Sequence, residues 1–225
     1  MADAYTMFWT RERCDALRRL GWAGRPLETL FGGPHTSERS FKRAGVRPGD
    51  DVYPISVRAG VLYVLGRIRV RRILALEDYV AYAADLFAPY LEEPPAWVFE
   101  SRGFSLSPRF VQATEAFDRY RAAHPAIQAL APTCTDEAVE CEDSTPLRFD
   151  LAVPPDMLAR LRFRSRRRER DLHNYLRNGR LIQSVGVQGI YRLSAPSARE
   201  LEALVLGHVV FDQQAILPGT HQQTL

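Results

Sequence analysis

The chain has 225 residues, a formal net charge of +3, 46% hydrophobic residues and 25% charged residues, which is ordinary for a soluble globular protein with a sizeable core. No apolar run approaches the ~20 residues that cross a bilayer and no signal-peptide pattern opens the sequence, so we expect a cytoplasmic protein without a membrane partner. Three cysteines without ligand spacing predict neither disulfides nor a zinc site, and no cofactor is expected.

The first 50 residues predict one strand and two helices. An aromatic-rich run at 5–9 favours a strand, and apolar residues at helical spacing favour a capped helix over 10–20. A second, short helix is expected to begin at Thr36 or Ser37 and to end before Gly45 in the left-handed conformation.

A basic pair of strands follows. Ala59-Gly60 predicts a two-residue hairpin between a strand at 52–58 and a second strand that reaches residue 71. Gly66 interrupts the second strand and marks a bulge or a close backbone approach. Beyond it, Ile68 and Val70 alternate with three residues that give the other face its positive charge: Arg67, Arg69 and Arg71.

The middle of the chain is expected to be helical and then irregular. Stripes of apolar residues predict helices over 76–91 and 108–123. Residues 132–146 carry five acidic side chains and almost no hydrophobic pattern, which predicts an exposed acidic loop. A strand at 147–153 and a turn of helix at 156–161 are expected after it.

The last third contains the strongest hairpin signal of the sequence. Asn178-Gly179 predicts a tight turn that pairs residues 172–176 with 181–187. A further strand is expected at 190–193. The capping box that begins at Ser197 predicts a final helix.

Positive charge is concentrated in this last third, where residues 151–200 carry 11 basic and 4 acidic side chains. One hypothesis is a polyanion-binding face, because several guanidinium groups can reach successive phosphates. The alternative is a solvated sheet face that pairs with the acidic loop. The crowded arginines are Arg160, Arg162, Arg164, Arg166, Arg167, Arg168 and Arg170.

Catalytic signatures are missing from the sequence. There is no phosphate-binding G-x-x-x-x-G-K, no dinucleotide G-x-G-x-x-G, no G-x-S-x-G and no H-E-x-x-H. The five histidines are scattered, and only His35, between a glycine loop and a helix start, is placed to donate to an anion or a base edge.

Several motifs resemble a known family in their order. Phe8-Trp9-Thr10, a glycine-containing loop leading to HTSERSF, VRPGDDVYPISV and LYVLGRIRV follow the succession seen in PUA-like domains, and look most like the EVE branch. The resemblance covers about residues 5–75 and the later strands. It departs at Gly32-Gly33-Pro34-His35, where the branch usually has tryptophan-glycine-valine-arginine-asparagine. The G-x-K-x-x-E-x-R motif of the related ASCH nucleases is not found.

PUA-like domains are small β pseudo-barrels that bind RNA or modified DNA bases, and the resemblance implies such a fold and such a ligand here. Carried over by position, the residues of the base pocket are Trp9, His35, Thr36, Arg39, Ser40 and Arg67.

Together these observations predict a single α+β domain over residues 1–225. Its N-terminal half and C-terminal hairpin are expected to form a PUA-like mixed β pseudo-barrel, with a helical insertion at 76–131 and the acidic loop at 132–146. The expected function is non-catalytic binding of DNA or RNA, with recognition of a modified or flipped nucleobase. The arginines expected on the nucleic-acid backbone are Arg69, Arg162, Arg164, Arg166, Arg167 and Arg168.

Two alternatives stay open. One is a nucleic-acid-processing hydrolase that uses His35 as general acid or base beside Asp50 or Asp51. The other is a regulatory module whose arginine cluster binds an acidic protein partner.

Overall fold

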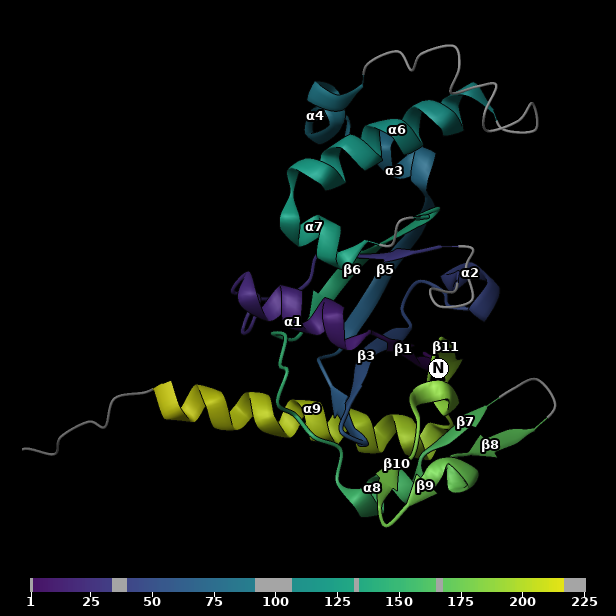
Figure 1. Ribbon diagram of the computed structural model, residues 1–225, viewed down its shortest axis with the longest axis vertical. Coiled ribbons are helices and arrows are strands. Elements are labelled where there is room, and N and C mark those ends of the chain that lie inside the picture. Colours follow the sequence, from purple (N-terminus) through teal and green to yellow (C-terminus); the bar gives the residue numbers. More distant parts are fainter. Residues whose placement is uncertain (1, 34–39, 92–106, 132–133, 165–167, 217–225) are drawn as a thin grey trace, which may run out of the picture.

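A computed structural model describes residues 2–33, 40–91, 107–131, 134–164 and 168–216, with side-chain surroundings described up to residue 207. The protein has an α+β fold. Figure 1 shows a central sheet with helices stacked beyond one end and a compact C-terminal unit beside the other. No helix among these residues is long and apolar enough to cross a membrane.

The central sheet has seven strands in the order β11-β1-β3-β5-β6-β2, with β4 paired to β3. Strands β1 and β3 are parallel, and the other pairs are antiparallel. The order has two ends, β11 and β2, so the described strands form a mixed sheet in which no closed barrel is found. The strands are β1 (Ala4–Phe8), β2 (Thr29–Gly32), β3 (Asp51–Arg58), β4 (Val61–Val64), β5 (Ile68–Ala75), β6 (Glu137–Ser144) and β11 (Ile190–Arg192).

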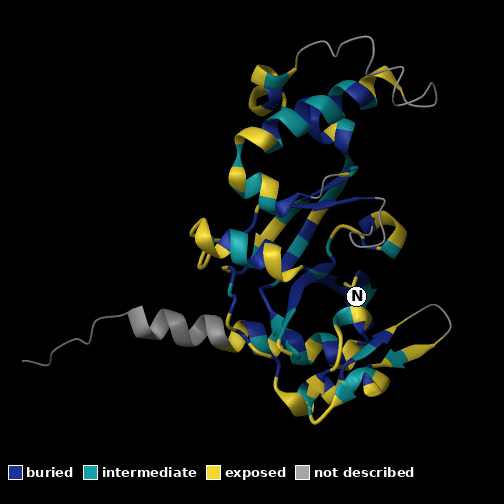
Figure 2. Cartoon of the chain, viewed as in Figure 1, coloured by how far each residue is buried: buried dark blue, intermediate teal, exposed yellow. Residues whose placement is uncertain are grey.

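Both faces of the sheet are buried at β3. Alternation along β3 sends Val52 into one hydrophobic cluster and Tyr53 into a second on the other face. The first cluster includes the helices after β5, and the second includes the C-terminal elements. In Figure 2 β1 and β3 are mostly dark blue, β5 and β6 also carry teal and yellow, and much of the unit around β7 to β10 is yellow.

Two N-terminal helices begin at side-chain caps. The Thr10 hydroxyl accepts a hydrogen bond from the Arg13 backbone N–H at 3.3 Å and starts α1 (Arg11–Arg19), as predicted. Ser40, rather than Thr36 or Ser37, caps α2 (Phe41–Ala44). Gly45 ends α2 with a φ of 88°, as the sequence predicted.

The segment between β5 and β6 is helical, as predicted, in the part that is described. Aromatic rings join it to the sheet: Phe31 of β2 lies 5.2 Å from Phe117 and 5.9 Å from Tyr79, measured between ring centroids. The helices are α3 (Leu76–Tyr82), α4 (Ala84–Phe87), the 3-10 helix η1 (Ala88–Tyr90), α6 (Pro108–Ala123) and α7 (Pro125–Leu130).

The predicted acidic loop is wrong over most of its length, because residues 137–144 form strand β6 between β5 and β2. Ala138 and Val139 are fully buried in the core. Two of the four acidic side chains of β6 are neutralised by basic partners: Glu140 pairs with Arg72, and Asp143 pairs with Arg67.

Two hairpin turns form where the sequence predicted them. Ala59 and Gly60 have φ values of 49° and 76°, and Asn178 and Gly179 have 51° and 72°, as tight two-residue turns require. The second hairpin consists of β9 (Leu176–Arg177) and β10 (Arg180–Leu181). It is a separate two-stranded sheet, shorter than predicted, and is not part of the central sheet.

The remaining elements complete the C-terminal unit. The expected strand at 147–153 is reduced to an isolated bridge between Tyr63 and Ala152. The final helix begins at Ala195, two residues before the predicted capping serine. The other elements are α8 (Pro155–Arg160), β7 (Arg162–Arg164), β8 (Glu169–Asp171), η2 (His173–Tyr175), η3 (Ser184–Gly186) and α9 (Ala195–Ile216).

Gly60 holds the β3–β4 turn against β10, and its replacement by alanine tests this contact. A Cβ at Gly60 would lie 2.8 Å from the Leu181 carbonyl oxygen, at a φ of +76°. We expect Gly60→Ala to lower the free energy of unfolding by about 3 kcal/mol, measured by urea denaturation. Gly21→Ala is the matched control: its φ is +72°, but a Cβ there meets no described atom within 4 Å, so only about 1 kcal/mol should be lost. Equal losses would contradict the contact.

Candidate functional site

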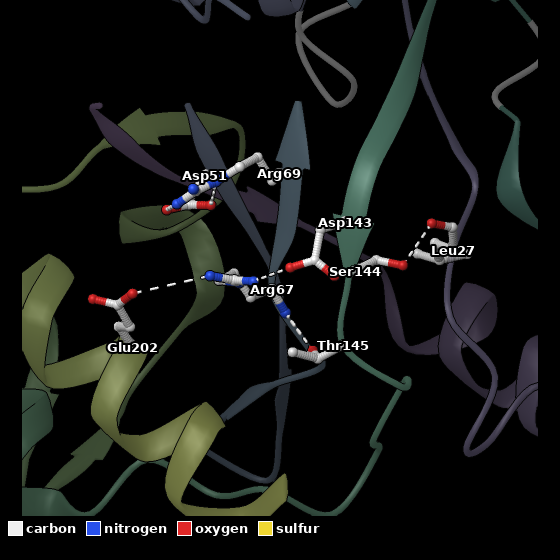
Figure 3. Close-up of polar contacts among 8 residues, drawn as sticks. All are labelled: Leu27, Asp51, Arg67, Arg69, Asp143, Ser144, Thr145 and Glu202. Atoms are coloured by element: carbon white, nitrogen blue, oxygen red, sulfur yellow. Dashed lines mark hydrogen bonds and ion pairs between the residues drawn. The ribbon is translucent and has the colours of Figure 1, made fainter. Parts of the chain in front are cut away.

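Three arginines in or next to β5 are held by acidic side chains. Arg67, which immediately precedes β5, forms an ion pair with Asp143 at the end of β6, and its guanidinium lies 4.0 Å from Glu202 of α9. Its backbone N–H donates to the Thr145 hydroxyl at 2.8 Å. Figure 3 shows this guanidinium between strand and helix, with Asp51 and Arg69 beside it. Only 12% of the Arg67 side chain is exposed, so it joins α9 to the sheet rather than facing a ligand.

Arg69 and Arg72 are paired in the same way. Two guanidinium nitrogens of Arg69 donate to the two carboxylate oxygens of Asp51 at 3.1 and 3.0 Å. Arg72 makes the same forked contact with Glu140 at 2.6 and 2.9 Å. Arg71, at an irregularity in the β5–β6 register, is exposed. Of the predicted basic face, Arg67 is therefore neutralised by the segment that was predicted to be an acidic loop and Arg69 by Asp51 of β3, whereas Arg71 is exposed.

The other described residues of the predicted base pocket lie inside the protein. Trp9 is 1% exposed in the main hydrophobic cluster, with the guanidinium of Arg13 5.7 Å from its ring. The buried Ser40 hydroxyl donates to the Glu137 carboxylate at 2.6 Å. Trp9, Ser40 and Arg67 thus make internal contacts. His35, Thr36 and Arg39 lie outside the described residues.

Glu137 supplies a hydrogen-bond acceptor to the first backbone N–H groups of α2. Its second carboxylate oxygen accepts from the backbone N–H of Phe41 at 2.7 Å and of Lys42 at 3.5 Å. The residue is 6% exposed and belongs to β6. The buried carboxylate of β6 therefore accepts hydrogen bonds from the first backbone N–H groups of α2, which have no acceptor within the helix.

The carboxylates considered for hydrolysis also have structural partners. Asp50 accepts hydrogen bonds from the backbone N–H groups of Asp3 and Arg47, both at 2.8 Å. Asp51 is occupied by Arg69. Among the residues with described side chains, no group of three or more histidine, cysteine or acidic residues is arranged to hold a metal ion.

Asp136 directly precedes Glu137, and its carboxyl group is partly removed from water. Burial, and then the charge of Glu137, raise the pKa of Asp136 above its ordinary value. Its Oδ1 atom has no hydrogen-bond partner among the described residues. Backbone bonds hold the residue in place: its N–H donates to the Gly32 carbonyl, and its carbonyl accepts from Leu76.

Replacing Asp136 by asparagine should therefore stabilise the protein at neutral pH. A raised pKa in the folded state means that stability is lost as pH rises through that pKa, when the buried group must ionise. We expect Asp136→Asn to have a higher Tm than the parent at pH 7, with the gain shrinking as pH falls through the raised folded-state pKa and lost near the unfolded pKa of about 4. Asp85→Asn, on the exposed part of α4, is the control in thermal unfolding followed by circular dichroism. A gain that does not depend on pH would contradict this account.

The remaining concentration of positive charge is on two small β-ribbons of the C-terminal unit. The arginine ribbon, residues 162–171, carries six arginines and two acidic residues. Its strands β7 and β8 pair antiparallel, with Arg162 opposite Asp171 and Arg164 opposite Glu169. Arg164 and Arg168 are exposed, and Arg166 and Arg167 lie outside the described residues.

The base of the arginine ribbon is anchored firmly. The Arg162 backbone N–H donates to the Ser197 hydroxyl at 2.9 Å, and its carbonyl accepts from Ser194 at 2.9 Å. The Arg162 guanidinium donates to the Ala159 carbonyl at 2.9 Å, so it closes the end of α8. One guanidinium nitrogen of Arg162 is therefore already used inside the protein, which leaves fewer donors for the predicted contact with a nucleic-acid backbone.

Arg170 fixes the second strand of the ribbon. Its guanidinium lies 4.5 Å from the Tyr191 ring centroid and 5.3 Å from that of Phe163, and it donates to the Gly186 carbonyl at 2.8 Å. Phe163 is buried in the second cluster. The ribbon therefore has an anchored base, while Arg164 and Arg168 toward its far end are exposed.

The β9–β10 hairpin carries a pair of arginines that the predicted site did not include. Arg177 and Arg180 are directly opposite each other across the strands, and both are exposed. Like charges in this position are destabilising, and among the described residues neither arginine forms an ion pair. The signal was present in the sequence Arg177-Asn178-Gly179-Arg180, because a two-residue turn places its flanking residues opposite each other.

No model of a known protein family matches the chain, and no curated protein matches it in sequence.

Proposed function

We propose that this protein binds nucleic acid, DNA or RNA, through the phosphate backbone and without catalysis. The observation that carries the proposal is the Arg177–Arg180 pair: two exposed guanidinium groups face each other across a hairpin at a cost to stability. A polyanion offsets that cost, because phosphates neutralise both charges and release counterions.

The arginine ribbon adds to this surface. Arg164 and Arg168 extend the exposed positive charge on a second two-stranded ribbon, and a two-stranded β-ribbon fits the major groove of a duplex. The resemblance to PUA-like domains supports the same class of ligand. Placement in the PUA-like class is itself a proposal that rests on the order of the sequence motifs.

Recognition of a modified or flipped base stays a prediction of that resemblance. It rests on His35, Thr36 and Arg39, outside the described residues. The proposed backbone contacts do not depend on them. They also differ from the set expected from sequence, since Arg69 is paired with Asp51, whereas Arg177 and Arg180 are added.

The test is the salt dependence of binding. Fluorescence anisotropy with a labelled duplex of about 20 base pairs, from about 50 to about 300 mM salt, should show an affinity that falls with a log–log slope of about −3 or steeper. A flat response, or no binding at low salt, would contradict the proposal. Equal competition by polyglutamate and by DNA of the same charge would instead favour an acidic protein partner.

A further inference from the structure

Two aliphatic side chains of the C-terminal unit are unusually exposed. Ile182 is 63% exposed and Val185 is 55% exposed, more than any other large aliphatic side chain among those described. Their neighbours Leu181 and Val187 are buried, at 4% and 0%. The segment 181–187 therefore contributes Leu181 and Val187 to the core, whereas Ile182 and Val185 face outward.

The segment that carries them is held at both ends. The Ile182 backbone N–H donates to the Tyr175 carbonyl at 2.9 Å, and the Gly186 carbonyl accepts from Arg170 at 2.8 Å. Gly186 lies against the Tyr175 ring so closely that a Cβ would be 2.8 Å from it. The backbone is thus fixed, so the two exposed side chains are presented from a defined position.

Both ends of this segment connect to arginine-bearing strands. Ile182 directly follows β10, which carries Arg180, and Gly186 is bound by Arg170 of β8. The exposed apolar pair therefore follows the hairpin in the chain and is tied back to the arginine ribbon by the Arg170–Gly186 hydrogen bond. Self-association through this surface would bring like charges together, which disfavours a second copy of the chain as its partner.

Building on the proposed function, we propose that Ile182 and Val185 form an apolar wedge that contacts the bases of a bound duplex at a weakly stacked step. Aliphatic side chains of nucleic-acid-binding proteins insert between base pairs in this way, while neighbouring arginines hold the phosphates. Unstacking costs least at a mismatch, so the preferred ligand is a duplex that contains one.

The test compares two labelled DNA duplexes of the same length, one fully matched and one with a central mismatch flanked by 2-aminopurine. We expect the full chain to bind the mismatched duplex about 10-fold more tightly, with an increase in 2-aminopurine fluorescence as the step unstacks. The double variant Ile182→Thr/Val185→Thr should lose both the preference and the fluorescence increase, and keep the salt slope. Leu20→Thr, at another exposed aliphatic side chain on the residue that ends α1, is the control and should change neither.

The outcomes separate this inference from the function on which it rests. Salt-dependent binding with equal affinity for both duplexes, or a double variant that keeps its preference, overturns the wedge and leaves nucleic-acid binding standing. Absence of salt-dependent binding to either duplex overturns both. Circular dichroism and thermal unfolding of each variant show whether it is folded.

Discussion

Replacing Arg164, Arg177 and Arg180 by glutamine is expected to weaken duplex binding about 100-fold near 0.1 M salt. Each of these exposed side chains is proposed to neutralise one phosphate, so the log–log salt slope should become shallower by about 3. Folding should be unaffected or slightly improved, because the Arg177–Arg180 repulsion is removed. Anisotropy titrations at several salt concentrations measure both quantities.

A charge-matched variant provides the control. Arg11, Arg19 and Arg109 are exposed on α1 and α6, and their replacement by glutamine removes the same formal charge elsewhere. We expect this variant to change the affinity by less than about 3-fold, through the long-range field alone. If both triple variants weaken binding equally, net charge and not the two ribbons determines affinity.

Glu137→Ala is expected to lower the free energy of unfolding by about 3 kcal/mol. The change removes the acceptor of the Ser40 hydroxyl and of the Phe41 amide, both in buried surroundings. Leaving buried donors without an acceptor costs their desolvation in full. Urea denaturation monitored by tryptophan fluorescence measures the loss.

Glu140→Ala on the same strand is the matched comparison. Glu140 also makes two short hydrogen bonds, but its partner Arg72 has a side chain that is 36% exposed, so water can replace the lost acceptor. A loss of about 1 kcal/mol is expected. Equal losses in the two variants would show that burial of the Ser40–Glu137 contact is not what makes it important.

Features set by neighbouring residues were predictable from the sequence. The turns at Ala59-Gly60 and Asn178-Gly179 depend on two residues each, and the Thr10 cap and the Gly45 helix end depend on a single turn of helix. The helices between β5 and β6 also follow from local periodicity.

Strand β6 was missed because its stability depends on residues far away in the chain. Its carboxylates suggested a solvated loop, yet Glu140 and Asp143 meet arginines that precede them by about 70 residues. A complementary pattern was visible, since one basic strand and one acidic segment are both present. Neither segment alone shows that these two pair with each other, or in which register.

The candidate site was predicted only in part for the same reason. Arg67 and Arg69 were treated as available because their partners were not known, and Trp9 was treated as accessible although it is buried. Arg164 and Arg168, which belong to the basic segment singled out in the sequence, are exposed, and their contact with a nucleic-acid backbone stays a prediction. The opposition of Arg177 and Arg180 follows from the turn but was not used.

The most direct measurement of the central claim is arginine modification by phenylglyoxal, followed by mass spectrometry, with and without a bound duplex. If the two C-terminal ribbons bind the phosphates, the duplex should protect Arg164, Arg177 and Arg180. The exposed Arg71 of β5 and Arg19 of α1 should remain reactive. Protection of Arg71 without protection of Arg177 and Arg180 would contradict the account and return the binding surface to the central sheet.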